Sequence, residues 1–256
     1  MIYLYALIED PLPGFKATLQ SLTGLQGRVQ LHPIGPWQLV FSEHGKDAIL
    51  PKRPDLLTHT RVLEQLMPFG TQLPARFGMA VEDIGAVERM IRAKSALLAE
   101  QFTRVRGCIE LGIRIRFARP LALGATLADD ARLIRERDRL ARLGPDAQLA
   151  WAEFGGKLAD RLDRRRGAAQ QALCRKLLPL CRAHVLRVPE EDVEVLRAEF
   201  LLPAEGQSAF LTAVEEAAAQ LDFAPGAAPE IKAVGPVPVY NFVRLNLMQD
   251  DSEEVT

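Results

Sequence analysis

Apolar side chains follow one another with strand-like spacing through residues 1–43 of the chain. Residues Ile2–Ile8 are a run of β-branched, aromatic and leucine side chains, which predicts a strand that stops before Pro11. The segments Arg28–Ile34 and Trp37–Glu43 are separated only by a Gly-Pro pair, so they predict a hairpin. Between these strands, Gly14–Leu25 fits either a short helix or an irregular loop.

Helical spacing takes over in the next part of the chain. After a proline-rich loop, a helix is predicted from about Thr58 to Met67, and Pro68 ends it because proline lacks the backbone donor. An extended segment over Phe69–Met79 follows. The next helix is predicted to begin after Asp83, an N-cap residue, and to end at Gly107. Its apolar positions recur at intervals of three, four or seven residues: Ile84, Val87, Ile91, Leu98, Phe102 and Val105.

The clearest alternation of apolar and polar residues lies just after this helix. One face of the predicted strand carries Ile109, Leu111, Ile113, Ile115 and Phe117. The other face carries Cys108, Glu110, Gly112, Arg114 and Arg116. This pattern predicts a strand with one face on a core and the other exposed to water or to a partner.

The second half of the chain repeats the same kinds of element. The predicted elements are helices over Ala125–Leu143 and Asp146–Arg187, a strand over Val193–Leu202, a helix over Glu205–Asp222, and strands over Ile231–Val234 and Val239–Leu247. Pro179 is expected to kink the end of the long helix. The last two strands flank the Gly-Pro-Val-Pro sequence at residues 235–238.

Helices packed on one side of a mainly antiparallel sheet make an α+β layer fold. We therefore expect two α+β domains, residues 1–119 and residues 120–248, the second with a long helical segment. Residues 249–256 are acidic and polar, and they are predicted to be a disordered tail.

Composition excludes several classes of protein. A hydrophobic content of 48% and a charged content of 25% are ordinary for a globular protein with a core. A net charge of -1 gives no general attraction to nucleic acid or to anionic membranes. No apolar run reaches the roughly 18 residues that a membrane-spanning helix needs. Three cysteines without a CxxC motif predict neither a disulfide framework nor a zinc site, and they favour a reducing cytoplasm.

No pattern of residues predicts catalysis, a metal or a cofactor. The four histidines are scattered, and no second ligand lies at helical spacing from any of them. There is no GxSxG motif. Gly155-Gly156-Lys157 resembles the end of a phosphate-binding loop, but Leu158 replaces the required Ser or Thr. The arginines and carboxylates of residues 132–142 are spaced for ion pairs along a solvated helix face.

Two segments stand out because a solvated face does not account for them. The first is the sequence LPARFG at residues 73–78, containing Pro74, Arg76 and Phe77, together with Arg114 and Arg116 on the later strand. It is either a structural turn, with Arg76 bound to local carbonyls, or a preformed docking edge. The second is GPVPVYNF at residues 235–242, which ends with Tyr240 and Phe242. It either packs internally or offers an aromatic surface to a partner.

These segments also carry a resemblance to a known family. The sequence PARFG at residues 74–78, the amphipathic helix, and GCIELGI at residues 107–113 resemble the core of the gas vesicle protein GvpF/GvpL family. The opening strand with Tyr3-Leu4-Tyr5-Ala6 is similar as well, and the resemblance extends to about Leu245. Near the C-terminus the family usually has Gly-Pro-Trp-Pro-Pro-Tyr, whereas this chain has Val237 in place of the Trp and Val239 in place of the second Pro.

The resemblance implies an accessory protein of gas vesicle assembly without catalysis or cofactor. It implies a two-domain α+β fold with a ferredoxin-like N-terminal domain. Its partners would be the hydrophobic shell protein GvpA and other gas vesicle accessory proteins, in the cytoplasm and in association with gas vesicles. Pro74, Arg76, Phe77, Arg114, Arg116, Tyr240 and Phe242 are the residues expected to contact a partner.

Two alternatives remain open. Ferredoxin-like sheets also occur in small-molecule-binding proteins and in cofactor-poor oxygenases, which would need a polar cluster inside a pocket. The candidates for that cluster are Arg76, Glu110 and Arg114. The other alternative is a structural shell component, but the high content of charged residues argues against a wall that must exclude water.

Overall fold

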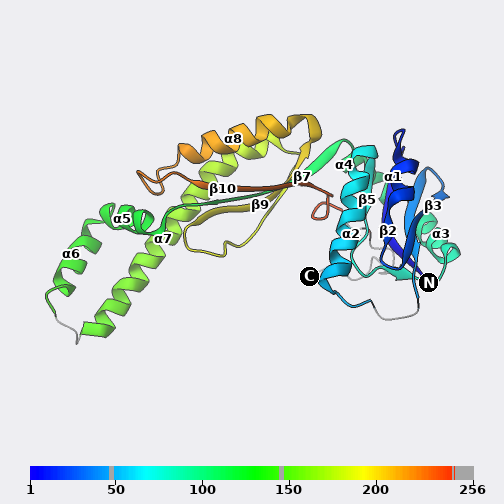
Figure 1. Ribbon diagram of the computed structural model, residues 1–256. Coiled ribbons are helices and arrows are strands. Elements are labelled where there is room, and N and C mark those ends of the chain that lie inside the picture. The colour runs from blue at the N-terminus through cyan, green and yellow to red at the C-terminus, as the bar shows by residue number, and fades with distance from the viewer. Residues whose placement is uncertain (46–48, 144–146, 244, 246–256) are drawn as a thin grey trace. The chain divides into compact units, whose positions relative to one another are not determined.

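The computed structural model describes residues 1–45, 49–143, 147–243 and 245 of the chain (Figure 1). The chain divides into two compact units. The first unit combines Met1–Glu110 with the C-terminal stretch from Pro236, and the second unit is Leu111–Gly235. This division differs from the predicted domains in two places. The first boundary falls within a strand and not at Pro120, and the end of the chain belongs to the first unit.

The first unit contains a six-stranded sheet in the order β2-β3-β4-β1-β5, with β6 also paired to β1. Its strands are β1 (Ile2–Glu9), β2 (Thr23–Gly24), β3 (Gly27–Ile34), β4 (Trp37–Glu43), β5 (Thr71–Pro74) and β6 (Ala80–Val81). The central strand β1 pairs antiparallel with both β4 and β5. Its unbroken apolar run is what a strand buried on both faces shows, and the predicted hairpin of β3 and β4 is confirmed.

Four helices and a short 3-10 turn complete the first unit. They are α1 (Phe15–Ser21), α2 (Arg53–Leu66), η1 (Met67–Phe69), α3 (Ile84–Ala93) and α4 (Ser95–Val105). Helix α2 begins five residues before the predicted start because Pro54 lies in its first turn, where proline is tolerated. The single helix predicted between Asp83 and Gly107 is interrupted at Lys94, although Asp83 caps it as expected by accepting a bond from the Ala86 amide.

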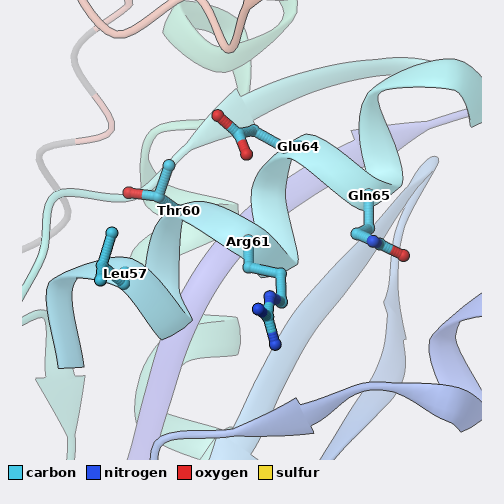
Figure 2. A pocket seen from close by; sticks show the side chains of 5 residues that line it. All are labelled: Leu57, Thr60, Arg61, Glu64 and Gln65. Atoms are coloured by element: carbon cyan, nitrogen blue, oxygen red, sulfur yellow. The ribbon is translucent and has the colours of Figure 1, made fainter. Parts of the chain in front are cut away.

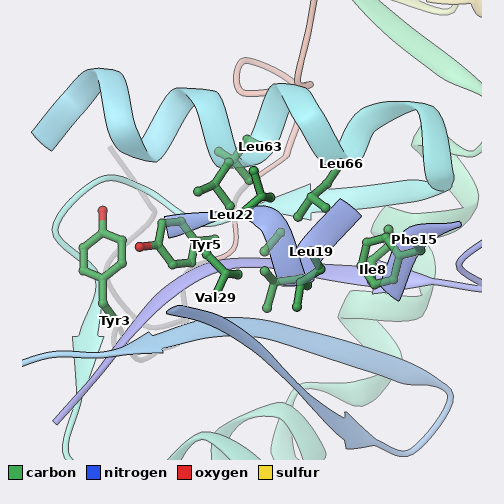
Figure 3. Packing of buried hydrophobic residues seen from close by; sticks show 12 residues of the cluster. Tyr3, Tyr5, Ile8, Phe15, Leu19, Leu22, Val29, Leu63 and Leu66 are labelled. Atoms are coloured by element: carbon green, nitrogen blue, oxygen red, sulfur yellow. The ribbon is translucent and has the colours of Figure 1, made fainter. Parts of the chain in front are cut away.

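The core of the first unit lies between the sheet and helices α1 and α2. Figure 3 shows Tyr3, Tyr5 and Ile8 of β1 beneath Leu63 and Leu66 of α2. All five side chains are fully buried. On α4, the ring of Phe102 stacks on Trp37 of β4, with 5.6 Å between the ring centroids.

The second unit contains a four-stranded sheet in the order β10-β7-β9-β8. Its strands are β7 (Cys108–Arg116), β8 (Ala183–Leu186), β9 (Glu194–Pro203) and β10 (Glu230–Val237). Its helical segments are α5 (Arg119–Ala128), α6 (Ala131–Leu140), α7 (Gln148–Leu177), η3 (Leu178–Leu180), η4 (Ala204–Gly206) and α8 (Gln207–Ala219). The apolar face predicted for β7 is confirmed, since Leu111, Ile113, Ile115 and Phe117 are buried.

Three predicted elements of the second half need correction. The segment Ala125–Leu143 is split into α5 and α6 at Asp129-Asp130, where Asp130 caps the second helix. The long helix stops at Leu177 because Pro179 cannot donate the next helical bond, and the chain then forms β8. No strand forms over Val239–Val243, where the chain turns instead, and most of residues 244–248 and the predicted tail 249–256 lie outside the described residues.

Both units connect their strands in the same order. In each, a first strand leads through helix to a pair of neighbouring strands, and a further helix leads to a fourth strand beside the first. The spatial orders β5-β1-β4-β3 and β10-β7-β9-β8 correspond element by element. This order is compatible with the ferredoxin-like arrangement predicted for the N-terminal part, and the mixed α and β architecture confirms the predicted class.

Candidate functional site

A tight turn after β5 carries Arg76 at its surface. The amide of Met79 donates to the carbonyl of Arg76 at 3.2 Å, and Gly78 adopts a φ of 88°. A positive φ at this position of a turn favours glycine because it has no Cβ atom. The Arg76 side chain is exposed, and within the described part of the chain it has no ion-pair partner.

Buried hydrogen bonds hold both sides of this turn. The Tyr3 hydroxyl lies 2.8 Å from Nδ1 of His59 and accepts from the Gly78 amide at 3.2 Å. On its other side the imidazole reaches the carbonyl of Ala75 through Nε2, at 3.2 Å. A carbonyl only accepts, so Nε2 carries the proton and Nδ1 accepts from Tyr3. Ala75 and Gly78 are thereby tied to both β1 and α2.

Aromatic rings surround the hydrogen bonds between Tyr3 and His59. The ring of Phe77 packs edge-on against His59, with centroids 5.8 Å apart, and against Tyr3 at 6.2 Å. The ring of Tyr5 stacks on His59 at 5.6 Å. Burial lowers the pKa of His59 from 6.5 to about 4, so the ring is neutral at pH 7. Buried side chains therefore hold the turn in place, and its shape does not depend on a bound partner.

The outer side of helix α2 carries a second surface feature of the first unit. Figure 2 shows a depression lined by residues of α2 alone, namely Leu57, Thr60, Arg61, Glu64 and Gln65. Tyr240 lies beside this depression. Its hydroxyl forms a hydrogen bond with Thr60, and the negative charge of Glu64 acts on it. Burial raises the pKa of Tyr240 to about 12, so its hydroxyl keeps its proton. Tyr240 as a whole residue is still 37% exposed, and it therefore contributes to the surface.

The rest of the C-terminal motif is bound to the same unit. Asn241 donates twice to the Glu110 carboxylate, from its amide to Oε2 at 2.9 Å and from Nδ2 to Oε1 at 2.6 Å. Three positions beyond the motif, Leu245 forms an isolated parallel bridge with Ala75. The two segments that the sequence singled out separately thus meet around α2 and β5, which the sequence did not predict.

The seven predicted contact residues differ in their exposure. Arg76 and Tyr240 are exposed and Phe77 is half-buried, whereas Pro74 and Phe242 are buried. A buried side chain cannot contact a partner directly, although it can fix the shape of the surface above it. Pro74 and Phe242 are therefore placed to shape the site and not to touch a partner. Partner binding at these residues stays a prediction.

Arg114 and Arg116 belong to the second unit and are engaged there. Arg116 binds Glu230 at 2.7 Å and Glu191 at 3.1 Å, and Arg114 reaches Glu190 at 3.5 Å. The hydrogen bond that Arg116 donates to the Glu230 carboxylate raises the pKa of Arg116. These arginines face outward as predicted, but they form part of an ion-pair network that links β7 to β10 and to the two glutamates that precede β9.

Sequence reasoning singled out neither His59 nor Thr60, and it assigned no contact to Asn241. It named Glu110 only as a candidate for the alternative polar cluster. Glu110 was expected on the exposed face of its strand and is instead 2% exposed, because Asn241 and its neighbours cover it. No pattern within β7 signals this, since the partner lies 131 positions away. For His59 a signal exists: it shares a helix face with Val62, Leu63 and Leu66, which marks the buried side of α2.

The described residues contain no cluster of three or more His, Cys, Asp or Glu side chains that could hold a metal ion. No described helix combines the length and the apolar composition needed to cross a membrane. Burial raises the pKa of both Cys174 and Cys181, which keeps them as poorly reactive thiols. The alternative of a small-molecule-binding protein needs a polar cluster of Arg76, Glu110 and Arg114. Arg76 and Glu110 belong to the first unit, whereas Arg114 belongs to the second, where it pairs with Glu190.

Comparison with known proteins gives one consistent result. The model of the family "Gas vesicle synthesis protein GvpL/GvpF" matches residues 1–244. Gas vesicle protein F of Nostoc sp. (strain PCC 7120 / SAG 25.82 / UTEX 2576) is 28% identical over 217 residues, covering 84% of this chain and 87% of that protein. Gas vesicle protein F of Microcystis aeruginosa (strain PCC 7806) is 28% identical over 218 residues with the same coverage.

Two crystal structures are similar to this fold. GvpF from Anabaena sp. PCC7120 superimposes with a TM-score of 0.80 at 26% identity, covering 95% of this chain and 98% of that one. GvpF from Microcystis aeruginosa gives a TM-score of 0.72 at 25% identity, covering 95% and 99%. The similarity therefore extends over both units.

Proposed function

Because this chain belongs to the gas vesicle synthesis protein GvpL/GvpF family and so has a role in gas vesicle assembly, we propose that it binds the hydrophobic shell protein GvpA. It would act as a chaperone-like or nucleating partner that keeps shell subunits from aggregating before they join the wall. Subunits with a large exposed apolar surface aggregate readily, and a protein that covers such a surface limits this.

The tight turn after β5 that carries Arg76 is the observation that supports this proposal best. Its backbone is fixed by Tyr3 and His59, so binding a partner there orders little additional chain. Tyr240 and the depression beside it on α2 offer further exposed side chains on the same unit. Such a surface combines an arginine and a tyrosine, the residue types that dominate the energetics of protein interfaces.

The proposed action is stoichiometric binding without turnover. The partner protein would be met in the cytoplasm, during vesicle assembly, together with other vesicle accessory proteins. The apolar interior of the first unit, filled by Tyr5, Phe15, Leu19 and Leu63, leaves no support for the alternative of a small-molecule pocket beneath α2.

Co-expression with GvpA followed by affinity capture tests the proposal. The wild-type chain is expected to retain GvpA, and Arg76→Ala and Tyr240→Ala are each expected to weaken capture by about tenfold, as loss of an interface anchor does. Arg92→Ala serves as the matched control, because Arg92 is an exposed arginine of the same unit on α3. The proposal is overturned if the folded wild-type chain captures no folded GvpA. It is also overturned if all three variants lose capture of GvpA to the same extent.

A further inference from the structure

Helix α6 of the second unit carries a row of arginines on one side (Figure 1). Arg132, Arg135 and Arg139 follow one another at intervals of three and four residues, which places them within about 60° of each other around the helix axis. Arg142 continues the row in the turn after α6, where its amide donates to the Arg139 carbonyl at 3.1 Å. All four residues are exposed, whereas a separate, apolar side of α6 packs against Phe154 of α7. We call these four arginines the α6 stripe.

The carboxylates within α6 do not neutralise the stripe. Glu136 pairs with Lys157 of α7 at 2.7 Å, and Asp138 pairs with the neighbouring Arg137 at 2.6 Å. The sequence predicted ion pairs along a single solvated face of this helix. In the structure both carboxylates are engaged by cations outside the stripe.

Asp130, the N-cap of α6, lies beside the first arginine of the stripe. It accepts from the Arg132 amide at 2.9 Å, a bond that lowers the pKa of this carboxyl, and the charge of Arg132 adds to that effect. For Arg135, Arg139 and Arg142, no ion pair or side-chain hydrogen bond is found within the described part of the chain. Most of the stripe therefore carries charge that no described carboxylate balances.

The stripe does not contribute to the folding of α6. Like charges three and four residues apart repel each other and destabilise the helix that carries them. The helix dipole favours cations in the last turn, but Arg132 and Arg135 lie outside that turn. An anionic partner would relieve the repulsion, because each guanidinium group can donate two parallel hydrogen bonds to one carboxylate.

The exposed side of α6 favours an acidic protein over the other kinds of anion. The helix has no aromatic ring on which a nucleic-acid base could stack. No large apolar side chain of α6 is exposed, whereas a helix that lies in a membrane surface needs an exposed apolar face. The net charge of -1 also gives the whole chain no long-range attraction to nucleic acid or to anionic membranes.

We propose that the α6 stripe is the docking surface for an acidic helix of a partner protein. Carboxylates three and four residues apart on such a helix repeat the spacing of the arginines, about 5 Å per step along the axis, so several ion pairs form side by side. The inference does not rest on the proposed function, because the stripe belongs to the second unit and the Arg76 turn belongs to the first.

The test uses the full-length chain and two fluorescent helical peptides of alanine. One peptide carries a row of Glu at intervals of three and four residues, and the other carries Lys at the same positions. We expect the wild type to bind the Glu peptide and not the Lys peptide. Binding should weaken several-fold between about 0.01 M and about 0.15 M salt, because exposed charges are then screened over shorter distances.

Charge reversal of the stripe gives the sharpest comparison. Arg135→Glu/Arg139→Glu should bind the Glu peptide at least about tenfold more weakly than the wild type does, and it should gain binding of the Lys peptide. The matched control is Arg175→Glu/Lys232→Glu, which reverses two exposed cations elsewhere in the second unit and changes the net charge equally. It should leave both affinities nearly unchanged.

Two results of these titrations overturn the proposal. One is a wild-type chain that does not bind the Glu peptide in low salt at concentrations up to about 1 mM. The other is an equal loss of affinity in both double variants. Should Arg135→Glu/Arg139→Glu fail to fold, Arg135→Ala/Arg139→Ala replaces it, since alanine is a strong helix former. That variant should bind the Glu peptide several-fold more weakly, and an unchanged affinity overturns the proposal.

Other occupants of the stripe are tested in parallel. A DNA duplex or phosphatidylserine vesicles may be bound more tightly than the Glu peptide and released by Arg135→Glu/Arg139→Glu; the assignment to an acidic protein is then wrong. A wild-type dimer in sedimentation that this variant dissolves identifies a second copy as the occupant and also overturns the assignment. Capture of GvpA is measured separately, so this proposal and the proposed function can fail independently.

Discussion

The hydroxyl of Tyr3 lies 2.8 Å from Nδ1 of His59, across 56 positions of sequence, and this contact fixes the shape of the Arg76 turn. Because the same hydroxyl also accepts from Gly78, and the imidazole also donates to Ala75, one buried pair orders both ends of a surface segment. The pair links the stability of the first unit to the geometry of its candidate docking surface.

Tyr3→Phe should therefore destabilise the chain. It leaves the buried Nδ1 of His59 without a donor and the Gly78 amide without its acceptor, a loss of about 1–3 kcal/mol in the free energy of unfolding. Urea denaturation followed by circular dichroism measures it. Tyr240→Phe removes a hydroxyl from a partly exposed ring and should lose clearly less; a larger loss there would contradict this account.

Stability should also fall on acidification through His59. Burial lowers its pKa from 6.5 to about 4, so the unfolded chain binds this proton more readily than the folded chain. The contribution is complete above pH 6.5 and is lost as the pH falls from 6.5 to 4, by about 3 kcal/mol in total. Urea midpoints at pH 7 and pH 4.5 test this. His59→Gln, which cannot titrate, should show a smaller difference between the two midpoints.

Two glycine substitutions should have opposite effects. A Cβ atom at Gly24 would lie 2.3 Å from the Tyr5 hydroxyl and 2.8 Å from Oγ of Ser42, both buried, so Gly24→Ala should lower stability by about 1–3 kcal/mol. A Cβ atom at Gly155, inside α7, would meet nothing within 4 Å, and Gly155→Ala should raise stability by up to about 1 kcal/mol. Thermal unfolding of the two variants compares them directly, and a destabilised Gly155→Ala chain would refute the second expectation.

Two arginines of the second unit should differ in their contribution to stability. Arg116 pairs with carboxylates that are more than half exposed, so Arg116→Ala should have little effect on stability, and less still in high salt. Arg165 is 16% exposed and binds the carbonyls of Phe223 and Asp222 together with Asp129. Its loss leaves those acceptors without a donor, and Arg165→Ala should lower stability by about 1–3 kcal/mol. Urea denaturation at low and high salt separates the two cases.

The elements that sequence predicted well are those with local periodicity. The alternation in Leu111–Phe117 located the buried face of β7, and Asp83 marked the start of α3, because both signals lie within a few residues of what they determine. The break at Lys94 has no Gly or Pro to announce it. The burial of Glu110 and the position of Asn241 arise from a contact between residues more than 100 positions apart, which no local pattern encodes.

The return of the C-terminal stretch to the first unit has a consequence for synthesis. Residues 1–110 emerge from the ribosome first, and domains generally fold in that order. The residues that cover Glu110 and bridge Ala75 are among the last to be translated. Throughout synthesis of the second unit, the nascent first unit therefore lacks the residues that cover the Glu110 carboxylate, and this cover forms only after Asn241 has left the ribosome.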